Sequence, residues 1–290
     1  MPELPEVETV RAGLSRVLPG KQITAVSFDT PKSFPNASSD VKQFLVGAQV
    51  IKIERRAKVI LIELSTSYSL IIHLKMTGQL VYRNGEEHFG AGHPNDSLIG
   101  ELPDKSTRVI LSMNDARLYF NDQRKFGWVR LVPTSEIPNI DFFKKLGPEP
   151  LNSSFSPEDF RGQFRIRPNS TIKAALLDQS VIAGVGNIYA DESLWGAKIH
   201  PATRVRDVSD KTFTLLYTEL RKILQLSIAK GGSTDRNYVT IEGKSGSYLQ
   251  FARVFRRESK PCPRCGTPII KIRVAGRGTH LCPHCQKVPV

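Results

Sequence analysis

The chain has 290 residues, of which 40% are hydrophobic and 24% are charged, and its net charge is +13. This ordinary globular composition excludes a fibrous or disordered protein, and the length suits two domains. No apolar run approaches the roughly 20 residues of a membrane span, and the N-terminus lacks signal-peptide features, so we expect a cytoplasmic protein. The excess charge lies in residues 161–290, with 22 basic and 9 acidic residues, whereas residues 1–160 carry 19 of each. This asymmetry favours a polyanionic partner such as nucleic acid, although a merely solubilising surface would also fit.

The first predicted element is a helix over residues 5–18, which Pro5 can begin and Pro19-Gly20 ends. Alternating apolar stretches with turn residues between them then predict strands, with no helix between successive members: 21–29, 47–65, 68–83, 106–121 and 127–133. This pattern favours an antiparallel β-sandwich or flattened barrel over residues 1–133. We also expect a short helix at 39–45 and a long loop at 84–104.

A proline-rich linker is predicted at 134–150, where composition and charge both change. Helical patterns follow it, at 156–164, 171–182, 187–196 and 209–230. We therefore expect an α+β protein with a catalytic β-sandwich domain at 1–133, the linker at 134–150, a helical domain at 151–260 and a C-terminal hairpin at 261–290.

All four cysteines lie in the last 29 residues, as two Cys-x-x-Cys pairs with 16 residues between them: Cys262, Cys265, Cys282 and Cys285. In a cytosolic protein this spacing predicts a zinc site rather than two disulfides, and four thiolates leave no open position on the metal. Strands at 267–274 and 279–282 should enclose the turn that carries Arg277. An arginine between glycines can grip a phosphate, although a solvated turn residue is the commoner outcome.

Pro2 and Glu3 form a candidate nucleophile and acid/base pair. Removal of Met1 would leave Pro2 with an N-terminal amine of pKa near 8, and its neutral fraction would exceed that of a lysine roughly a hundredfold. Such an amine can attack an electrophilic carbon and form a Schiff base, with Glu3 moving protons. The same residues also suit a plain lead-in to a helix, and this segment alone does not decide between the two interpretations.

Three further features allow both a functional and a structural interpretation. Gly184 and Gly186 lead to Asn187 at a helix start, where a phosphate can bind, but ordinary helix capping explains them equally well. A second feature is a group of side chains at strand ends that could fill the gap left by an extruded base, or lie in a core: Met76, Arg124 and Phe126. The third is Lys58, which would either contact a phosphate or be solvated.

Four segments, in this order along the whole chain, resemble those of the Fpg/Nei family of bifunctional DNA repair enzymes, and within it the bacterial formamidopyrimidine-DNA glycosylases. They are Pro2–Glu8, Arg124–Gly127, Gly184–Glu192, and Cys262–Cys285 with its Gly276-Arg277-Gly278-Thr279-His280 turn. The resemblance implies an N-terminal helix and β-sandwich, a helix-two-turn-helix domain and a zinc-finger hairpin with one structural Zn²⁺. It also implies a monomer that binds damaged double-stranded DNA.

The resemblance further implies excision of oxidised purines, such as 8-oxoguanine and formamidopyrimidines, through an imine with Pro2 and then β,δ-elimination. The implied catalytic residues are Pro2, Glu3, Lys58 and Arg277, supported by Glu6. The implied DNA and lesion contacts are His73, Met76, Arg124, Phe126, Lys173, Asn187 and Tyr238, the last within a lesion-facing loop at 231–248.

The sequence departs from the family pattern in places that concern loops and lesion preference. Lys105-Ser-Thr-Arg108 stands where many relatives have Lys-His-x-His, Phe255-Arg256 stands for Tyr-Gly, and Asn237 for a frequent Asp. One alternative is an endonuclease VIII-like enzyme for oxidised pyrimidines, against which the 124–127 segment and Met76 argue. Another is a non-catalytic zinc-ribbon protein that binds DNA, against which the intact Pro2, Glu3 and Lys58 argue.

Overall fold

The computed structural model describes residues 2–85, 87–93, 96–233 and 248–288. The chain divides into two compact units: the first is Met1–Lys144 with Lys230–Ser247, and the second is Lys145–Ala229 with Tyr248–Val290. The predicted linker at 134–150 contains the division between Lys144 and Lys145. The predicted division into four parts is finer than these two units and stays a prediction.

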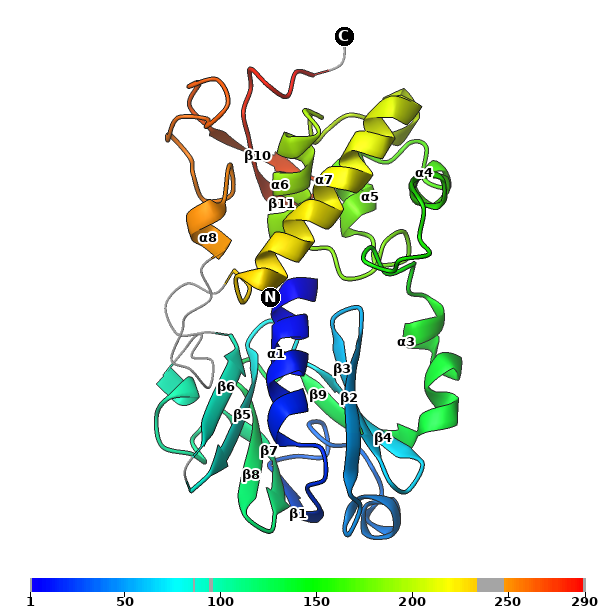
Figure 1. The fold of residues 1–290 in the computed structure, drawn as a ribbon, viewed down its shortest axis with the longest axis vertical. Coiled ribbons are helices and arrows are strands. Elements are labelled where there is room, and N and C mark those ends of the chain that lie inside the picture. The colour runs from blue at the N-terminus through cyan, green and yellow to red at the C-terminus, as the bar shows by residue number, and fades with distance from the viewer. Residues whose placement is uncertain (1, 86, 94–95, 234–247, 289–290) are drawn as a thin grey trace. The chain divides into compact units, whose positions relative to one another are not determined.

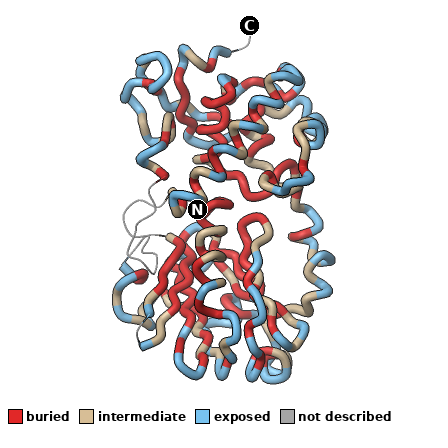
Figure 2. The backbone as a smooth tube through the Cα atoms, viewed as in Figure 1, coloured by how far each residue is buried: buried red, intermediate tan, exposed pale blue. Residues whose placement is uncertain are grey.

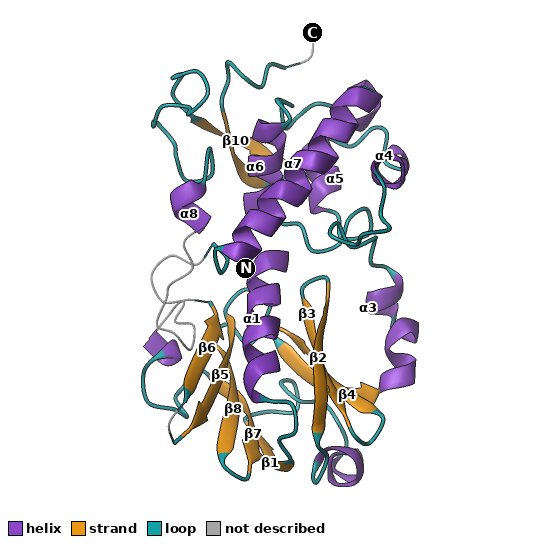
Figure 3. Ribbon diagram, in the orientation of Figure 1, coloured by secondary structure: helices purple, strands orange, loops and turns teal. Residues whose placement is uncertain are grey.

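The first unit is built on two antiparallel sheets, which confirms the predicted sandwich (Figures 1 and 3). The five-stranded sheet has the order β1-β7-β8-β5-β6, and the four-stranded sheet has the order β2-β3-β4-β9. Their bounds are β1 Ile23–Phe28, β2 Val50–Arg56, β3 Val59–Leu64, β4 Tyr68–His73, β5 Gly78–Asn84, β6 His88–Gly92, β7 Thr107–Met113, β8 Ala116–Asp122 and β9 Trp128–Pro133. The three longest predicted stretches, 47–65, 68–83 and 106–121, each contain two strands joined by a turn.

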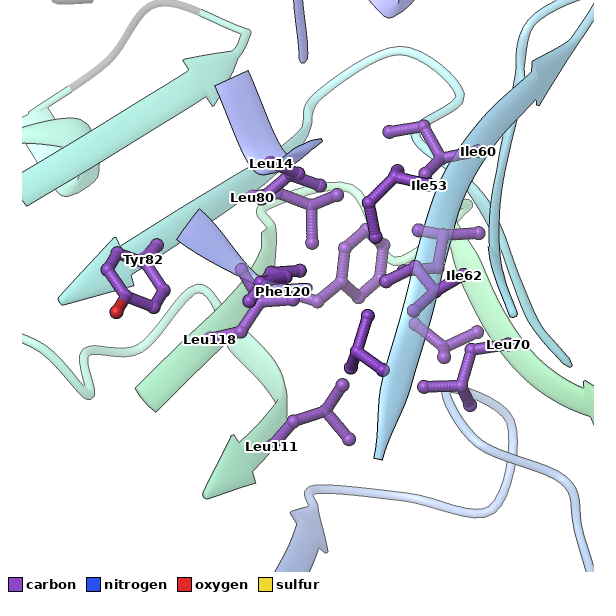
Figure 4. Close-up of a cluster of buried hydrophobic side chains, with 14 of the residues drawn as sticks. Leu14, Ile53, Ile60, Ile62, Leu70, Leu80, Tyr82, Leu111, Leu118 and Phe120 are labelled. Atoms are coloured by element: carbon purple, nitrogen blue, oxygen red, sulfur yellow. The ribbon is translucent and has the colours of Figure 1, made fainter. Parts of the chain in front are cut away.

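Helix α1 (Leu4–Val17) contacts β2 and β6, which are edge strands of the two sheets. Its apolar face is buried there, with Leu14 fully enclosed. Figure 4 shows Leu14 in one buried cluster with Ile53 of β2 and Leu80 of β5, so the helix and both sheets share one core. Burial of each such side chain contributes about 1.5–3 kcal/mol. The hydrophobic core therefore fixes the helix that carries the N-terminal residues.

The predicted loop at 84–104 contains strand β6 and a short 3₁₀ helix, η2 (Asp96–Leu98), so this expectation was wrong. The sequence of β6 includes two glycines, which weaken any intrinsic strand preference. The strand forms because it pairs with β5 and because Phe89 is buried in the core of the first unit. Tertiary contacts thus override the local sequence.

The remaining short elements of the first unit are α2 (Ser38–Asp40), the π-helical η1 (Val41–Leu45), the 3₁₀ helix η3 (Thr134–Asn139) and α3 (Asp141–Lys144). The first two together account for the short helix predicted at 39–45.

The second unit is helical, with a two-stranded hairpin near its end (Figure 3). Its elements are α4 Pro157–Arg165, α5 Ile172–Leu177, α6 Asn187–Gly196, η4 Val205–Asp207, α7 Asp210–Ala229, α8 Tyr248–Phe251, β10 Ile270–Val274 and β11 Arg277–Leu281. Helix α7 contacts α4 and α6, and its buried residues join the second core (Figure 2). Helix α5 ends five residues earlier than predicted, because residues 178–186 form turns before α6. None of the helices within the described ranges could cross a membrane.

Candidate active site and nucleic-acid interface

Pro2 and Glu3 lie buried at the start of α1. Glu3 is the N-cap residue, and its N–H donates to Glu6 Oε2 at 2.9 Å. The other oxygen of Glu6 accepts from the N–H of Ser233 at 2.8 Å. A carboxylate at a helix N-terminus is stabilised by the helix dipole. Glu6 therefore joins the start of the helix to the segment at 230–233, where the predicted lesion loop begins.

Lys58 and His73 meet at one end of the four-stranded sheet. Lys58 lies in the turn between β2 and β3, His73 ends β4 opposite Val59 of β3, and both side chains are buried. Burial, with the nearby charges of Lys75 and Lys58, lowers the pKa of His73 to about 3. Its Nδ1 accepts from the N–H of Lys75 at 2.9 Å, so the neutral ring carries its proton on Nε2. In Figure 1 the β2–β3 turn and the start of α1 lie at the same end of the first unit.

The three predicted void-filling residues come together in the first unit. Met76 and Phe126 are 41% and 49% exposed, which is high for large apolar side chains. The Arg124 guanidinium carbon lies 4.8 Å from the centre of the Phe126 ring, and Arg124 Nη1 lies 3.1 Å from Met76 Sδ. We call these three residues the void-filling cluster. They are surface residues, so the core interpretation does not apply.

In the second unit, the turn between α5 and α6 is held by one side chain. Gln179 accepts from the N–H of Gly184 and donates to the carbonyl of Val185, both at 2.9 Å. Gly186 is the N-cap of α6, and Asn187 follows as its first residue and donates to the carbonyl of Gly278 on β11 at 3.0 Å. A ten-residue helix thus begins beside the hairpin strand, and helix N-termini favour phosphate.

The four cysteine sulfurs fit a single metal ion. They lie within 4.8 Å of one another, and Cys265 Sγ is 3.4 Å from Cys282 Sγ. Zinc–sulfur bonds of about 2.3 Å require four thiolates grouped in this way, with no position left for water. Trp195 of α6 donates to Cys262 Sγ at 3.4 Å, so the site is anchored to the helical region of its unit. These residues hold one structural zinc ion.

Arg277 lies beside the tip of the hairpin rather than at it. The turn consists of Ala275 and Gly276, with φ of 50° and 72°, and Arg277 pairs with Val274 as the first residue of β11. Two positive φ values in succession fit a tight hairpin turn, which explains the glycine. The Arg277 side chain is exposed and available to a ligand.

Lys173 is fully buried, unlike a residue that contacts a phosphate directly. Its ammonium donates to Asp191 Oδ1 and Thr279 Oγ1, each at 2.6 Å. The second oxygen of Asp191 accepts from the N–H of His280 at 2.9 Å. Lys173 of α5 and Asp191 of α6 therefore hold strand β11. The expected direct contact with DNA does not fit this geometry, because protein groups enclose the ammonium.

Sequence reasoning missed the two carboxylates that follow Tyr189-Ala190 in the third motif. Asp191 binds β11 as described, and Glu192 accepts the main-chain N–H groups of residues 253–255 at 2.8–3.1 Å. Burial raises the pKa of Glu192, while these N–H groups favour its charged form. Two adjacent acidic residues inside a helix that has no other charged residue were the available signal. Tyr238, a predicted DNA contact, lies outside the described residues.

Three family models match the chain in order. They are the formamidopyrimidine-DNA glycosylase N-terminal domain at residues 1–129, its H2TH domain at 146–238, and the zinc finger found in FPG and IleRS at 259–288. Among curated relatives, the formamidopyrimidine-DNA glycosylase of Pelotomaculum thermopropionicum is 41% identical over 290 residues, covering 99% of this chain and 100% of the relative. That of Listeria innocua is 40% identical over 289 residues, with the same coverage.

Solved structures agree with these relatives. The Lactococcus lactis Fpg in complex with DNA containing an abasic site has a TM-score of 0.87 and 35% identity, with 99% of this chain and 100% of that chain covered. A mutant of the same enzyme in complex with DNA containing Fapy-dG has a TM-score of 0.87 and 34% identity, with the same coverage.

The fold and the motifs define a zinc-finger DNA glycosylase. The chain belongs to the formamidopyrimidine-DNA glycosylase family. Its activity is base-excision repair of oxidised purines and formamidopyrimidine lesions in DNA, by a glycosylase that is also an AP lyase.

Proposed function

We propose that Pro2, after removal of Met1, is the nucleophile of this glycosylase and that Glu3 is its general acid/base. The observation that carries the proposal is the position of both residues at the capped, buried start of α1, held by the Glu3–Glu6 hydrogen bond of 2.9 Å. A buried N-terminal amine is held in one place, and an amine with pKa near 8 is substantially neutral at physiological pH. Glu6 supports the site by fixing the main chain of Glu3.

In the proposed reaction, the Pro2 nitrogen forms a bond to C1′ of the damaged nucleoside as the bond from C1′ to the base breaks. The departing base takes a proton, and the sugar ring opens to leave a cationic imine between Pro2 and C1′. The imine acidifies the C2′ proton, so a base can remove it and expel the 3′ phosphate, after which a second elimination expels the 5′ phosphate. Lys58 serves as a proton donor and a phosphate contact at this site.

DNA binding is proposed to involve both units. In the first unit, His73 is a neutral hydrogen-bond donor through Nε2, and Met76, Arg124 and Phe126 fill the gap left by the extruded nucleotide. In the second unit, Asn187 and Arg277 contact phosphates near the lesion, which the start of α6 and the exposure of Arg277 support.

Lys173 acts indirectly in this proposal, since it holds the strand that carries Arg277. Tyr238 keeps its predicted role in the lesion-facing loop. We further propose that the protein works as a monomer on double-stranded damaged DNA in the bacterial cytoplasm, as the bacterial relatives and the DNA complexes of the Lactococcus enzyme suggest.

Borohydride trapping tests the nucleophile directly. Processed wild-type protein, incubated with an 8-oxoguanine:cytosine duplex and sodium borohydride, should form a covalent adduct at Pro2 that mass spectrometry can map. The adduct should be absent with Pro2→Gly and with protein that keeps Met1, because neither presents the proline amine. An adduct of normal yield with Pro2→Gly would remove Pro2 from the mechanism.

Lesion preference is tested by comparing single-turnover excision of 8-oxoguanine opposite cytosine with excision of thymine glycol. The enzyme should excise the oxidised purine faster. A preference for thymine glycol would instead favour the endonuclease VIII-like alternative.

A further inference from the structure

Asp122, the last residue of β8, is buried beneath the void-filling cluster and is 1% exposed. One carboxylate oxygen, Oδ1, accepts from the hydroxyl of Thr77 and from the N–H of Arg124, the latter at 3.1 Å. The other oxygen, Oδ2, accepts from the N–H of Phe126 at 2.8 Å and from that of Gly127 at 2.6 Å. A single carboxylate thus binds four donors.

These donors belong to the two turns that carry the cluster. Thr77 follows Met76 directly, and its hydroxyl also accepts from the N–H of Arg124 at 3.1 Å. The strand register places Gly78 of β5 opposite Asp122 of β8, so the two turns emerge side by side. Asp122 therefore couples the turn of Met76 to the turn of Arg124 and Phe126.

The second turn closes tightly around this carboxylate. A Cβ on Gly127 would lie 2.6 Å from the ring of Phe120, 3.0 Å from the carbonyl oxygen of His73 and 3.1 Å from Asp122 Oδ2. A side chain at position 127 would therefore force the Phe120 ring to shift and crowd the His73 carbonyl. The short N–H···O contact at Gly127 depends on this close approach.

Arg108 holds the main chain of Asp122, and it belongs to the segment where the sequence departs from its family pattern. Its Nε donates to the Asp122 carbonyl at 2.8 Å, and its Nη1 contacts Asp29 Oδ2 at 2.6 Å. The Arg108 side chain is itself buried. The main chain at Asp122 is therefore held by an ion-paired guanidinium, while its carboxylate holds the two turns.

We propose that Asp122 is a positioning residue that fixes the void-filling cluster for base extrusion; this inference rests on the proposed void-filling role of the cluster. An exposed methionine, arginine and phenylalanine can hold a base stack open only if their main chain resists displacement. Hydrogen bonds from N–H groups to an ionised carboxylate are stronger than neutral ones, and an unsatisfied buried donor is costly. Asp122 supplies this rigidity without touching DNA.

The test variant is Asp122→Asn, which keeps the size of the side chain. Its amide oxygen can still accept from the N–H groups of Phe126 and Gly127 while its NH₂ donates to the Thr77 hydroxyl, so the contacts remain but the charge of the acceptor is lost. Weaker hydrogen bonds from Phe126 and Gly127 predict a fall of roughly tenfold in single-turnover excision of 8-oxoguanine. Elimination at a preformed abasic site should fall less than about threefold, because no base has to be unstacked there.

Asp104→Asn is the matched control. Asp104 also organises a turn of the first unit, by accepting from Ser97 Oγ and from the N–H of Ser106, but within the described residues it makes no hydrogen bond to the void-filling cluster. Its substitution should leave the ratio of excision to elimination unchanged.

Thr77→Val is a milder second variant, which removes one donor to Asp122 and should shift the ratio in the same direction as Asp122→Asn. It decides the question if Asp122→Asn does not fold.

Phe126→Ala, alone and combined with Asp122→Asn, separates this inference from the function on which it rests. If Asp122 acts through the cluster, the double variant should excise no more slowly than the slower single variant. Normal excision by Phe126→Ala would overturn the void-filling role itself. If Phe126→Ala excises slowly, either of two results would overturn the role of Asp122. One is a normal ratio of excision to elimination in Asp122→Asn or Thr77→Val. The other is a double variant whose loss of excision equals the product of the two single losses.

Discussion

The void-filling cluster of the first unit and the zinc hairpin of the second unit both present exposed side chains above buried polar groups. The cluster rests on Asp122, which accepts main-chain N–H groups and one hydroxyl. The hairpin rests on four thiolates and on the fully buried pair of Lys173 and Asp191. One region is thus held by a single carboxylate, and the other by a metal site and a buried ion pair.

This difference predicts different kinds of failure. A carboxylate that binds main-chain donors can be altered at the cost of local order, because the sandwich core does not depend on it. A buried ion pair behaves otherwise, since the loss of one partner leaves a charge without compensation in a dry environment. A metal site in a short hairpin contributes folding energy outright. Substitutions that disrupt the hairpin should therefore destabilise the protein more, and impair individual reaction steps less selectively, than substitutions beneath the cluster.

Zinc removal is expected to give the largest effect. Chelation, or Cys282→Ser, should unfold the hairpin that carries Arg277 and weaken duplex binding on the order of a hundredfold, because the phosphate contacts of this segment are lost together. Fluorescence anisotropy with a labelled abasic duplex measures the affinity, and atomic absorption measures the metal. The fluorescence of Trp195 should change in parallel, since its ring donates to Cys262. Full binding by metal-free protein would contradict the structural role of the zinc ion.

The next effect in size concerns the buried ion pair. Lys173→Met keeps the length of the side chain but leaves Asp191 without its cation, which should lower the free energy of unfolding by about 3–5 kcal/mol. Adding Asp191→Asn should recover part of this loss, because the double variant buries no charge. Urea unfolding followed by circular dichroism measures both. Independent, small effects of the two substitutions would show that the pair does not hold the hairpin.

The salt dependence of DNA binding distinguishes an indirect role of Lys173 from a direct phosphate contact. Each phosphate contact adds roughly 0.9 to the slope of log K against log salt concentration. Arg277→Ala should reduce this slope by about one, whereas Lys173→Met should leave it unchanged in the folded fraction. A reduced slope for Lys173→Met would restore the direct contact that the sequence predicted.

Much of the fold and of the candidate site could be predicted from the sequence, because it depends on residues that are close together along the chain. Cysteine spacing predicted the metal site, and the glycines before Asn187 predicted the start of α6. What escaped depends on partners distant in the sequence. Strand β6 forms through pairing despite its glycines, and Lys173 is buried because Asp191 and Thr279 enclose it. Asp122 was invisible because its partners include main-chain N–H groups, which are present at every non-proline residue.

The smallest expected effect is a pH dependence of stability that arises in the first unit. The second unit pairs its buried lysine with a carboxylate, whereas the first unit buries His73 near two cations, Lys75 and Lys58. The pKa of His73 is about 3 in the folded protein, against 6.5 for an ordinary histidine. Above pH 6.5 both the folded and unfolded states hold it neutral, so it does not affect stability. Below pH 6.5 only the unfolded state gains the proton, so stability falls with pH down to about 3.

The expected loss at pH 5 is about 2 kcal/mol, from 1.4 kcal/mol per pH unit. His73→Asn keeps a hydrogen-bond acceptor for the N–H of Lys75 but cannot titrate. Its free energy of unfolding should therefore decline less than that of the wild type between pH 7 and pH 5. The Hε1 resonance of His73 should also stay at its neutral position down to about pH 4 in the folded protein. Parallel stability curves for the two proteins would mean that His73 has the same pKa in the folded and unfolded states, as an exposed histidine would have.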